Sequence, residues 1–285
     1  MNSRVSRFAL ALLLICAASS LAQGPGLPTT QPNFVTIVRE EVKVGRSADH
    51  EKIEAGWPAA FEKAKSPYYY VALESLTGAN EAWYVTSFDS HAAIADSLKR
   101  ESSDPVLFAE LARLSRADAE VINSLRVVHA RARKELSYGA FPNVGKARFF
   151  EISWFRVRPG HEAGFEAAAK AYGSAAGRSA PNTSYRVYEV IAGAIGPTYL
   201  VFSSVDGFAE FDQVMQSGDK IMKGFTPDEG ATFQKFFTEG LINSETHRFR
   251  LNPVMSYVPK ETRAQDPDFW TPKKPAAAPK PSSQP

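Results

Sequence analysis

Two stretches of the chain share one pattern of apolar and polar residues. Residues 34–45 and 149–160 are extended, β-rich runs, and each ends in a valine, a basic residue, one further residue and a glycine. Apolar residues follow at helical spacing, namely Ile53, Trp57, Phe61 and Ala64 in the first half, and Phe165, Ala169, Tyr172 and Ala176 in the second. The pattern therefore predicts a strand and then a helix at the start of each half.

The match between the halves continues through a hairpin and a second helix. Residues 70–74 correspond to 185–189, and residues 83–89 correspond to 200–206. A further helical pattern and an arginine-rich strand close each half. Each half thus has the order β-α-β-β-α-β of a ferredoxin-like unit. We expect an α+β fold in which two tandem ferredoxin-like (βαββαβ) units form an intrachain pseudo-dimeric α/β barrel, because each unit can cover the open sheet face of the other.

Composition divides the chain into six segments. They are a signal peptide (1–22), a linker (23–32), repeat 1 (33–140), a linker (141–147), repeat 2 (148–258) and a disordered Pro/Ala/Lys tail (259–285). Arg4 and Arg7 precede a short apolar run, and Ser20 and Ala22 suit a cleavage site, so we expect export to the periplasm or secretion from a bacterium. An uncleaved anchor is the alternative.

Charge and cysteine content exclude several classes of partner and site. The chain has 33 Lys+Arg and 31 Asp+Glu, with no basic block, so no nucleic-acid partner is expected. The one cysteine, Cys16, lies in the predicted signal, so the mature chain has neither disulfides nor thiolate ligands. No later apolar run is long enough to span a membrane. Monomer and homodimer both stay open.

The order of elements over residues 33–258 resembles the dimeric α/β-barrel superfamily, which includes antibiotic-biosynthesis-monooxygenase-like, NIPSNAP-like and EthD-like proteins. The resemblance implies that the two sheets close into a barrel. Haem-degrading members carry a histidine after the second helix, where this chain has Glu110 and Leu111. Chlorite-dismutase-like members need an axial histidine on a helix of the C-terminal half, whereas His247 falls in a predicted strand. No cofactor is therefore predicted, and haem is kept as a weaker alternative.

Four residues are candidates for acid–base chemistry. Glu74 and Glu189 are equivalent in the two halves, and His129 and His247 lie on the two fourth strands. A carboxylate that faces a closed barrel is desolvated, which raises its pKa and suits proton transfer. The alternative is that the strand carboxylates pair with nearby arginines. The other histidines, His50, His91 and His161, are expected on the surface. No metal site is predicted, because no two histidines have the spacing of metal ligands.

Aromatic and arginine side chains are frequent on the predicted strands and indicate a pocket between the two sheets. The candidate ligand-binding residues are Tyr70, Trp83, Arg131, Glu151, Trp154, Arg156, Tyr185 and Tyr199. Such a pocket suits an aromatic or carboxylate-bearing small molecule. Three functions stay open: a small-molecule-binding protein, a cofactor-independent monooxygenase- or isomerase-like enzyme, and a non-catalytic structural or interaction protein with a filled barrel.

Overall fold

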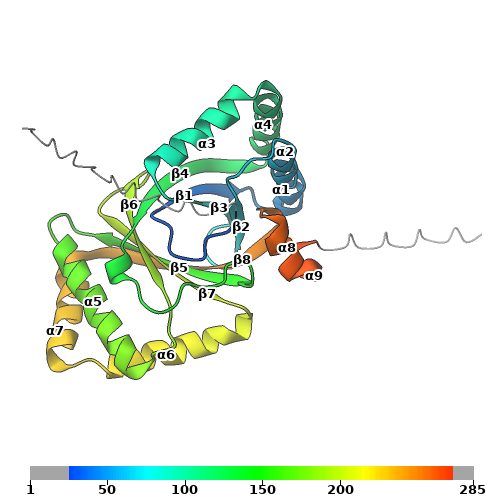
Figure 1. Ribbon diagram of the computed structural model, residues 1–285. Coiled ribbons are helices and arrows are strands. Elements are labelled where there is room, and N and C mark those ends of the chain that lie inside the picture. Colours follow the sequence, from blue (N-terminus) through cyan, green and yellow to red (C-terminus); the bar gives the residue numbers. More distant parts are fainter. Residues whose placement is uncertain (1–25, 272–285) are drawn as a thin grey trace, which may run out of the picture.

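The computed structural model describes residues 26–271, and each half of it has the predicted order of elements (Figure 1). The predicted signal peptide, and the predicted tail after residue 271, lie outside the described residues. The first half consists of β1 (Phe34–Val42), α1 (Ser47–Glu54), α2 (Gly56–Lys63), β2 (Tyr70–Ser75), β3 (Glu81–Phe88), α3 (His91–Ser103), α4 (Pro105–Asp118) and β4 (Ile122–Ala132). The second half consists of β5 (Phe149–Val157), α5 (Glu162–Ser179), β6 (Arg186–Ala192), β7 (Thr198–Val205), α6 (Phe211–Lys223), α7 (Pro227–Lys235) and β8 (Leu241–Tyr257). Short helical turns cover residues 134–136, 208–210 and 236–240.

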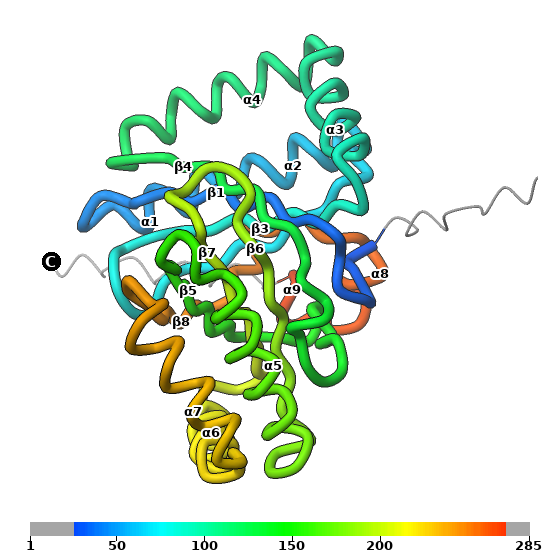
Figure 2. The backbone as a smooth tube through the Cα atoms, turned by 90° about the vertical axis from the view of Figure 1, so that its left-hand side faces the viewer, coloured from blue at the N-terminus to red at the C-terminus, as the bar shows by residue number. Residues whose placement is uncertain are grey.

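The eight strands form one closed antiparallel barrel in the order β1-β3-β2-β8-β5-β7-β6-β4. The halves join where β2 pairs with β8 and where β4 pairs with β6. Figure 2 shows the barrel between two groups of helices, with α1 to α4 on one side and α5 to α7 on the other. The predicted pseudo-dimeric α/β barrel is confirmed. Within the described residues, every helix is too short or too polar to cross a bilayer.

The lumen of the barrel is packed with side chains from both halves. Trp83, Ile152 and Phe249 belong to one cluster there, and each is at most 1% exposed. The Trp83 ring lies 4.6 Å from the Phe249 ring and 5.7 Å from the Trp154 ring, measured between centroids. Small eight-stranded barrels are commonly filled in this way. A hollow of about 80 Å³ is left at one end, between the barrel and the segment around Leu27. The lumen therefore has little space for the predicted ligand pocket between the sheets.

The start of the predicted disordered tail is folded, which corrects its boundary. Helices α8 (Lys260–Gln265) and α9 (Pro267–Trp270) follow β8, and Phe269 and Trp270 of α9 pack against the cluster of residues in the lumen. Trp270 is 4% exposed, and its Nε1 donates a hydrogen bond to the Gly145 carbonyl at 3.0 Å. Asp266 caps α9 and forms an ion pair with Arg148. A cap followed by an aromatic pair can fold a short segment that its proline content alone would leave unstructured.

Replacing Trp270 with alanine is expected to lower the free energy of unfolding by about 3 kcal/mol, because it removes a buried indole and leaves a cavity. Urea denaturation measures this change. Asp268→Ala, at an exposed position of the same short helix, is the matched control and should change stability by less than about 0.5 kcal/mol. Equal stability of the Trp270 variant and the wild type would mean that α9 does not pack as described.

Candidate functional site

Strand alternation sends the predicted site residues to two different faces of the barrel. The lumen cluster alternates along each strand with residues that face the helices. By this alternation the lumen receives Trp83, Trp154, Arg156 and His247. The helix-facing side receives Tyr70, Glu74, His129, Arg131, Glu151, Tyr185, Glu189 and Tyr199. The structure therefore does not assemble these residues into one site.

The strand carboxylates proposed for acid–base chemistry lie outside the lumen and pair with arginines. Glu74 accepts a hydrogen bond from Arg250 at 2.8 Å, and Glu189 accepts one from Arg131 at 2.7 Å. His129 is half-buried on the outer face, separate from both. His247 does face the lumen, where its Nε2 lies 3.2 Å from a carboxylate oxygen of Glu245. The proposal that Glu74 and Glu189 are desolvated in the lumen is therefore wrong, and the alternative of arginine pairing is confirmed.

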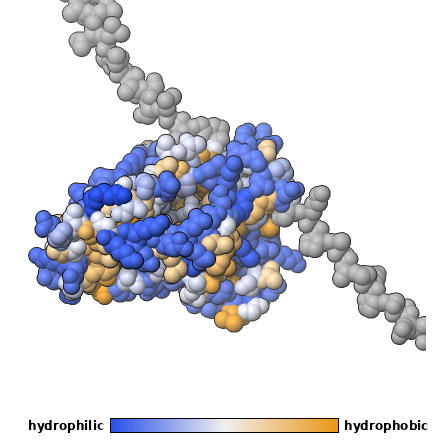
Figure 3. Space-filling view, turned by 90° about the horizontal axis from the view of Figure 1, so that it is seen from below, coloured by the Kyte–Doolittle hydropathy of each residue, from blue (hydrophilic) through white to orange (hydrophobic). Residues whose placement is uncertain are grey.

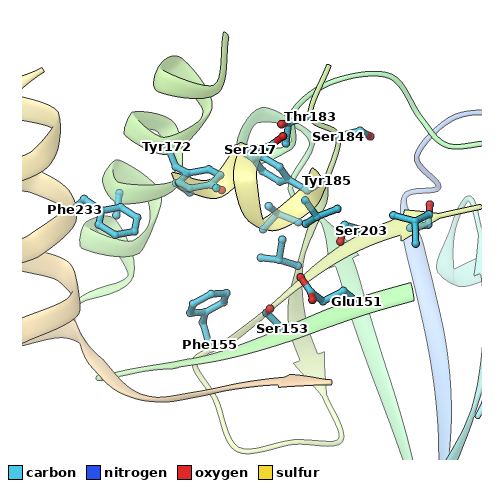
Figure 4. A pocket seen from close by; sticks show the side chains of 18 of the residues that line it. Glu151, Ser153, Phe155, Tyr172, Thr183, Ser184, Tyr185, Ser203, Ser217 and Phe233 are labelled. Carbon is cyan, nitrogen blue, oxygen red and sulfur yellow. The ribbon is translucent and has the colours of Figure 1, made fainter. Parts of the chain in front are cut away.

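A cavity with a volume of about 500 Å³ lies in the second half. It separates the outer face of β5, β6 and β7 from the helices α5, α6 and α7 (Figure 4). Of the predicted ligand-binding residues, Glu151 and Tyr185 line it. Sequence reasoning missed the rest of the lining, including Tyr172, Thr183, Ser217 and the phenylalanines. The face of the molecule that carries these helices is hollowed near its centre, between hydrophilic and apolar residues (Figure 3).

The second half has this cavity because its sheet presents small side chains to the helices. Ser153 and Ser203 face the cavity from β5 and β7. In the first half, the helix-facing side of the sheet is filled by Tyr70, Tyr84 and Met255. Short serine side chains cannot fill the space between a sheet and its helices, so a hollow remains.

One wall of the cavity is aromatic. The Phe233 ring stacks on Phe237, with centroids 4.5 Å apart, and lies 6.2 Å from the Tyr172 ring at an interplanar angle of 25°. Phe165 and Phe236 meet edge to face at 5.5 Å. Rings that hold one another in this way form a rigid apolar surface, which suits a flat ligand.

The polar side of the cavity has hydroxyl groups without partners. The Tyr185 Oη and Thr183 Oγ1 atoms are buried and make no hydrogen bond in the described structure. Burial raises the pKa of the Tyr185 hydroxyl, which keeps it protonated as a donor. Opposite these groups, Glu151 accepts a hydrogen bond from Arg248 Nε at 2.9 Å. An unpaired buried hydroxyl is costly, so both groups are available to a ligand.

Tyr185→Phe is expected to leave the ligand-free protein as stable as the wild type, or to stabilise it by about 1 kcal/mol, because it removes an unsatisfied buried hydroxyl. Chemical denaturation of the purified protein measures the change. Tyr138→Phe serves as the control, since Tyr138 packs 6.2 Å from Tyr185 but is not part of the cavity lining. A loss of more than about 1 kcal/mol in Tyr185→Phe would show that the hydroxyl has a partner.

Haem does not fit the donors of this cavity. Among the described residues that line it there is no histidine, cysteine, methionine or lysine. Haem iron is usually held by histidine, cysteine or methionine, and less often by the phenolate of tyrosine. Burial raises the pKa of Tyr172 and of Tyr185, which disfavours a phenolate at either position. The lining residues therefore do not support the haem alternative.

A second cluster of buried polar side chains lies beneath the helices of the first half. It joins Glu40 on β1 with His50 and Glu54 on α1, and His50 is only 3% exposed. The prediction of a surface position for His50 is therefore wrong. Burial, and then the nearby carboxylates of Glu40 and Asp118, raise the pKa of Glu54 well above its usual range. The four-residue spacing of His50 and Glu54 on one helix was the available sequence signal.

Comparisons with known proteins identify the fold. No protein-family model matches the sequence, and no curated protein matches it either. A solved structure from Fusobacterium nucleatum, provisionally described as a monooxygenase, is 6% identical and has a TM-score of 0.53; the match covers 78% of this chain and 93% of that one. A similarly described protein from Lactobacillus acidophilus is 8% identical, with a TM-score of 0.48 and coverages of 78% and 94%. An anthrone oxidase-like protein is 11% identical, with a TM-score of 0.47 and coverages of 79% and 93%. The Fusobacterium structure has the same overall fold as this chain.

Proposed function

We propose that this chain, which has the fold of the dimeric α/β-barrel superfamily, is an exported protein that binds a small aromatic compound in the cavity of its second half. The observation that carries the proposal is the cavity of about 500 Å³, with an aromatic wall and unpartnered Tyr185 and Thr183 hydroxyls. Pockets for small molecules have this size and this combination of apolar walls with a few polar groups. The export signal predicted in residues 1–22 supports the compartment.

The polar groups define the ligand further. Tyr185 donates a hydrogen bond, so the ligand needs an oxygen acceptor near that end. Glu151 lines the cavity and bonds Arg248 through one of its carboxylate oxygens. Its carboxylate repels an anion and accepts a hydrogen bond from a ligand hydroxyl. A neutral, flat hydroxylated aromatic compound meets these requirements better than the carboxylate-bearing ligand that strand arginines suggested.

The enzyme alternative uses the same cavity. A cofactor-independent monooxygenase- or isomerase-like reaction needs a base beside the ligand, and Glu151 and Glu210 are the carboxylates in the lining. Binding alone requires neither to react. Liquid chromatography coupled to mass spectrometry, applied to the ligand after incubation with the protein in air, separates the two functions. Oxygenation changes the mass of the ligand and isomerisation changes its retention time, whereas binding alone changes neither.

The test of binding is calorimetric titration with 2-naphthol as a neutral probe and 2-naphthoate as its anionic counterpart. We expect one-to-one binding of 2-naphthol and weaker binding of the anion. Tyr185→Phe should weaken 2-naphthol binding by about 5- to 10-fold, the loss of one hydrogen bond, and Tyr138→Phe should not change it. Absence of binding, or equal effects of the two variants, would contradict the proposal.

A further inference from the structure

The first half contains a closed cluster of acidic side chains around one histidine. Glu40 comes from β1, and His50 and Glu54 lie one turn apart on α1. One ligand atom of each lies within 4.8 Å of the others, and these residues are 5%, 3% and 3% exposed. His50 Nε2 lies 2.9 Å from a carboxylate oxygen of Glu40. The arrangement brings two oxygen donors and one nitrogen donor to a single point below the surface.

The cluster has more carboxyl groups than basic partners for them. Asp118, at the end of α4, lies beside Glu54 and accepts a hydrogen bond from Trp57 Nε1 at 3.1 Å. In the described part of the chain, no lysine or arginine forms an ion pair with Glu40, Glu54 or Asp118. Buried carboxylates are normally paired with a cation or bound to a metal. His50 alone cannot pair with all of them.

Three buried polar atoms in this region have no hydrogen-bond partner. They are Glu54 Oε1, Asp118 Oδ1 and Tyr70 Oη. Tyr70 is 8% exposed, and its hydroxyl lies close enough to Glu54 and Glu40 for their charges to act on it. Unsatisfied buried atoms on and beside this cluster indicate a missing partner, because each one costs stability while it is unpaired.

We propose that Glu40, His50 and Glu54 bind one divalent transition-metal ion, with Asp118 beside it as a further carboxylate. Donor atoms bound to zinc at 2.0–2.2 Å are about 3–4 Å apart, so the observed spacing needs only small side-chain movements. The 2.9 Å hydrogen bond between His50 and Glu40 is slightly shorter than this separation, so the two side chains need to move apart only a little to share an ion. The imidazole nitrogen favours Zn²⁺, Mn²⁺ or Fe²⁺ over Mg²⁺ and Ca²⁺, which prefer oxygen ligands.

The position of the cluster assigns the ion a structural role. None of its proposed ligands lines either of the two cavities described above, so neither cavity brings a substrate to the ion. The ion would join β1 to α1 and bring the end of α4 against them. The proposal concerns the first half alone, and it is independent of the ligand cavity in the second half.

The first measurement uses the wild-type protein, stripped with a chelator and then titrated with Zn²⁺. We expect one equivalent to bind and the melting temperature to rise by about 5–10 °C at saturation. Millimolar Mg²⁺ should give no such rise. Co²⁺ in place of Zn²⁺ should give visible absorption bands with the intensity of a low-coordinate site. Binding of less than 0.1 equivalent, with no change in melting temperature, would overturn the proposal.

Variants locate the ion. Glu54→Gln keeps the size of the side chain and should abolish both the Zn²⁺-dependent rise and the Co²⁺ bands, and His50→Gln should do the same. His247→Gln is the matched control, since His247 also pairs with a glutamate, Glu245, on another part of the chain. If His50→Gln fails to fold, Glu54→Gln and the wild-type Co²⁺ spectrum still decide the matter. Retention of one equivalent by Glu54→Gln, or its loss in His247→Gln, would contradict the assignment.

Discussion

Replacing Trp83 with alanine is expected to lower the free energy of unfolding by about 4 kcal/mol, the largest effect of any substitution considered for this barrel. Trp83 is fully buried in the lumen and touches residues of both halves. The Arg39 guanidinium lies 4.4 Å from the centre of the Trp83 ring, and Trp83 Nε1 donates a hydrogen bond to Glu81 at 2.6 Å. Loss of the indole therefore removes apolar contacts, and it also removes the ring that packs against Arg39 and the hydrogen-bond donor of Glu81.

Urea denaturation of Trp83→Ala measures this loss. Phe108→Ala is the matched control, because Phe108 is an aromatic residue that is 58% exposed on α4, and its removal should cost less than about 0.5 kcal/mol. The folded Trp83 variant should also bind 2-naphthol as the wild type does, since Trp83 does not line the large cavity. A changed affinity together with unchanged stability would favour a ligand site in the lumen.

Ser217→Phe is expected to weaken the binding of 2-naphthol by about 30-fold or more, because the added ring occupies the space of the ligand. Ser217 projects from α6 into the cavity, and its short side chain is part of the reason that the cavity exists (Figure 4). Calorimetric titration gives the affinity, and thermal unfolding shows whether the variant is folded.

Gln216→Phe is the matched control for that substitution. Gln216 is the preceding residue of the same helix and is exposed. The same ring placed there should leave the affinity unchanged. A Ser217 variant that binds like the wild type would show that the ligand does not enter between α6 and the sheet.

The order of elements could be predicted from the sequence because strand and helix periods differ and the two halves carry the same pattern. Which residues of each strand face the lumen could not be predicted from the sequence. In β2, Tyr70, Val71, Ala72 and Leu73 are all buried, since one face packs in the lumen and the other packs against helices. A strand that is apolar on both faces does not reveal which residues point inward. Glu74 and Glu189 were therefore assigned to the wrong side.

The sites were harder to predict than the fold because they are assembled from distant segments. Glu151 and Tyr185 were recognised as candidates, but the serines that leave the cavity open have no signature of their own. His50 and Glu54 showed ligand spacing on one helix, whereas Glu40 and Asp118 join them only through the packing of β1 and α4. The folded helix α9 depends on Trp270, whose partner Gly145 is far away in the sequence.

The most direct test of the central claim is hydrogen–deuterium exchange of the wild-type protein with and without saturating 2-naphthol. Bound ligand should slow exchange in α5, α6 and α7 and in the segment around Thr183, which together surround the cavity. Exchange in α1 to α4 should stay the same. Protection confined to the first half or to the lumen-end segment around Leu27, or no protection at saturation, would contradict a ligand site in the second half.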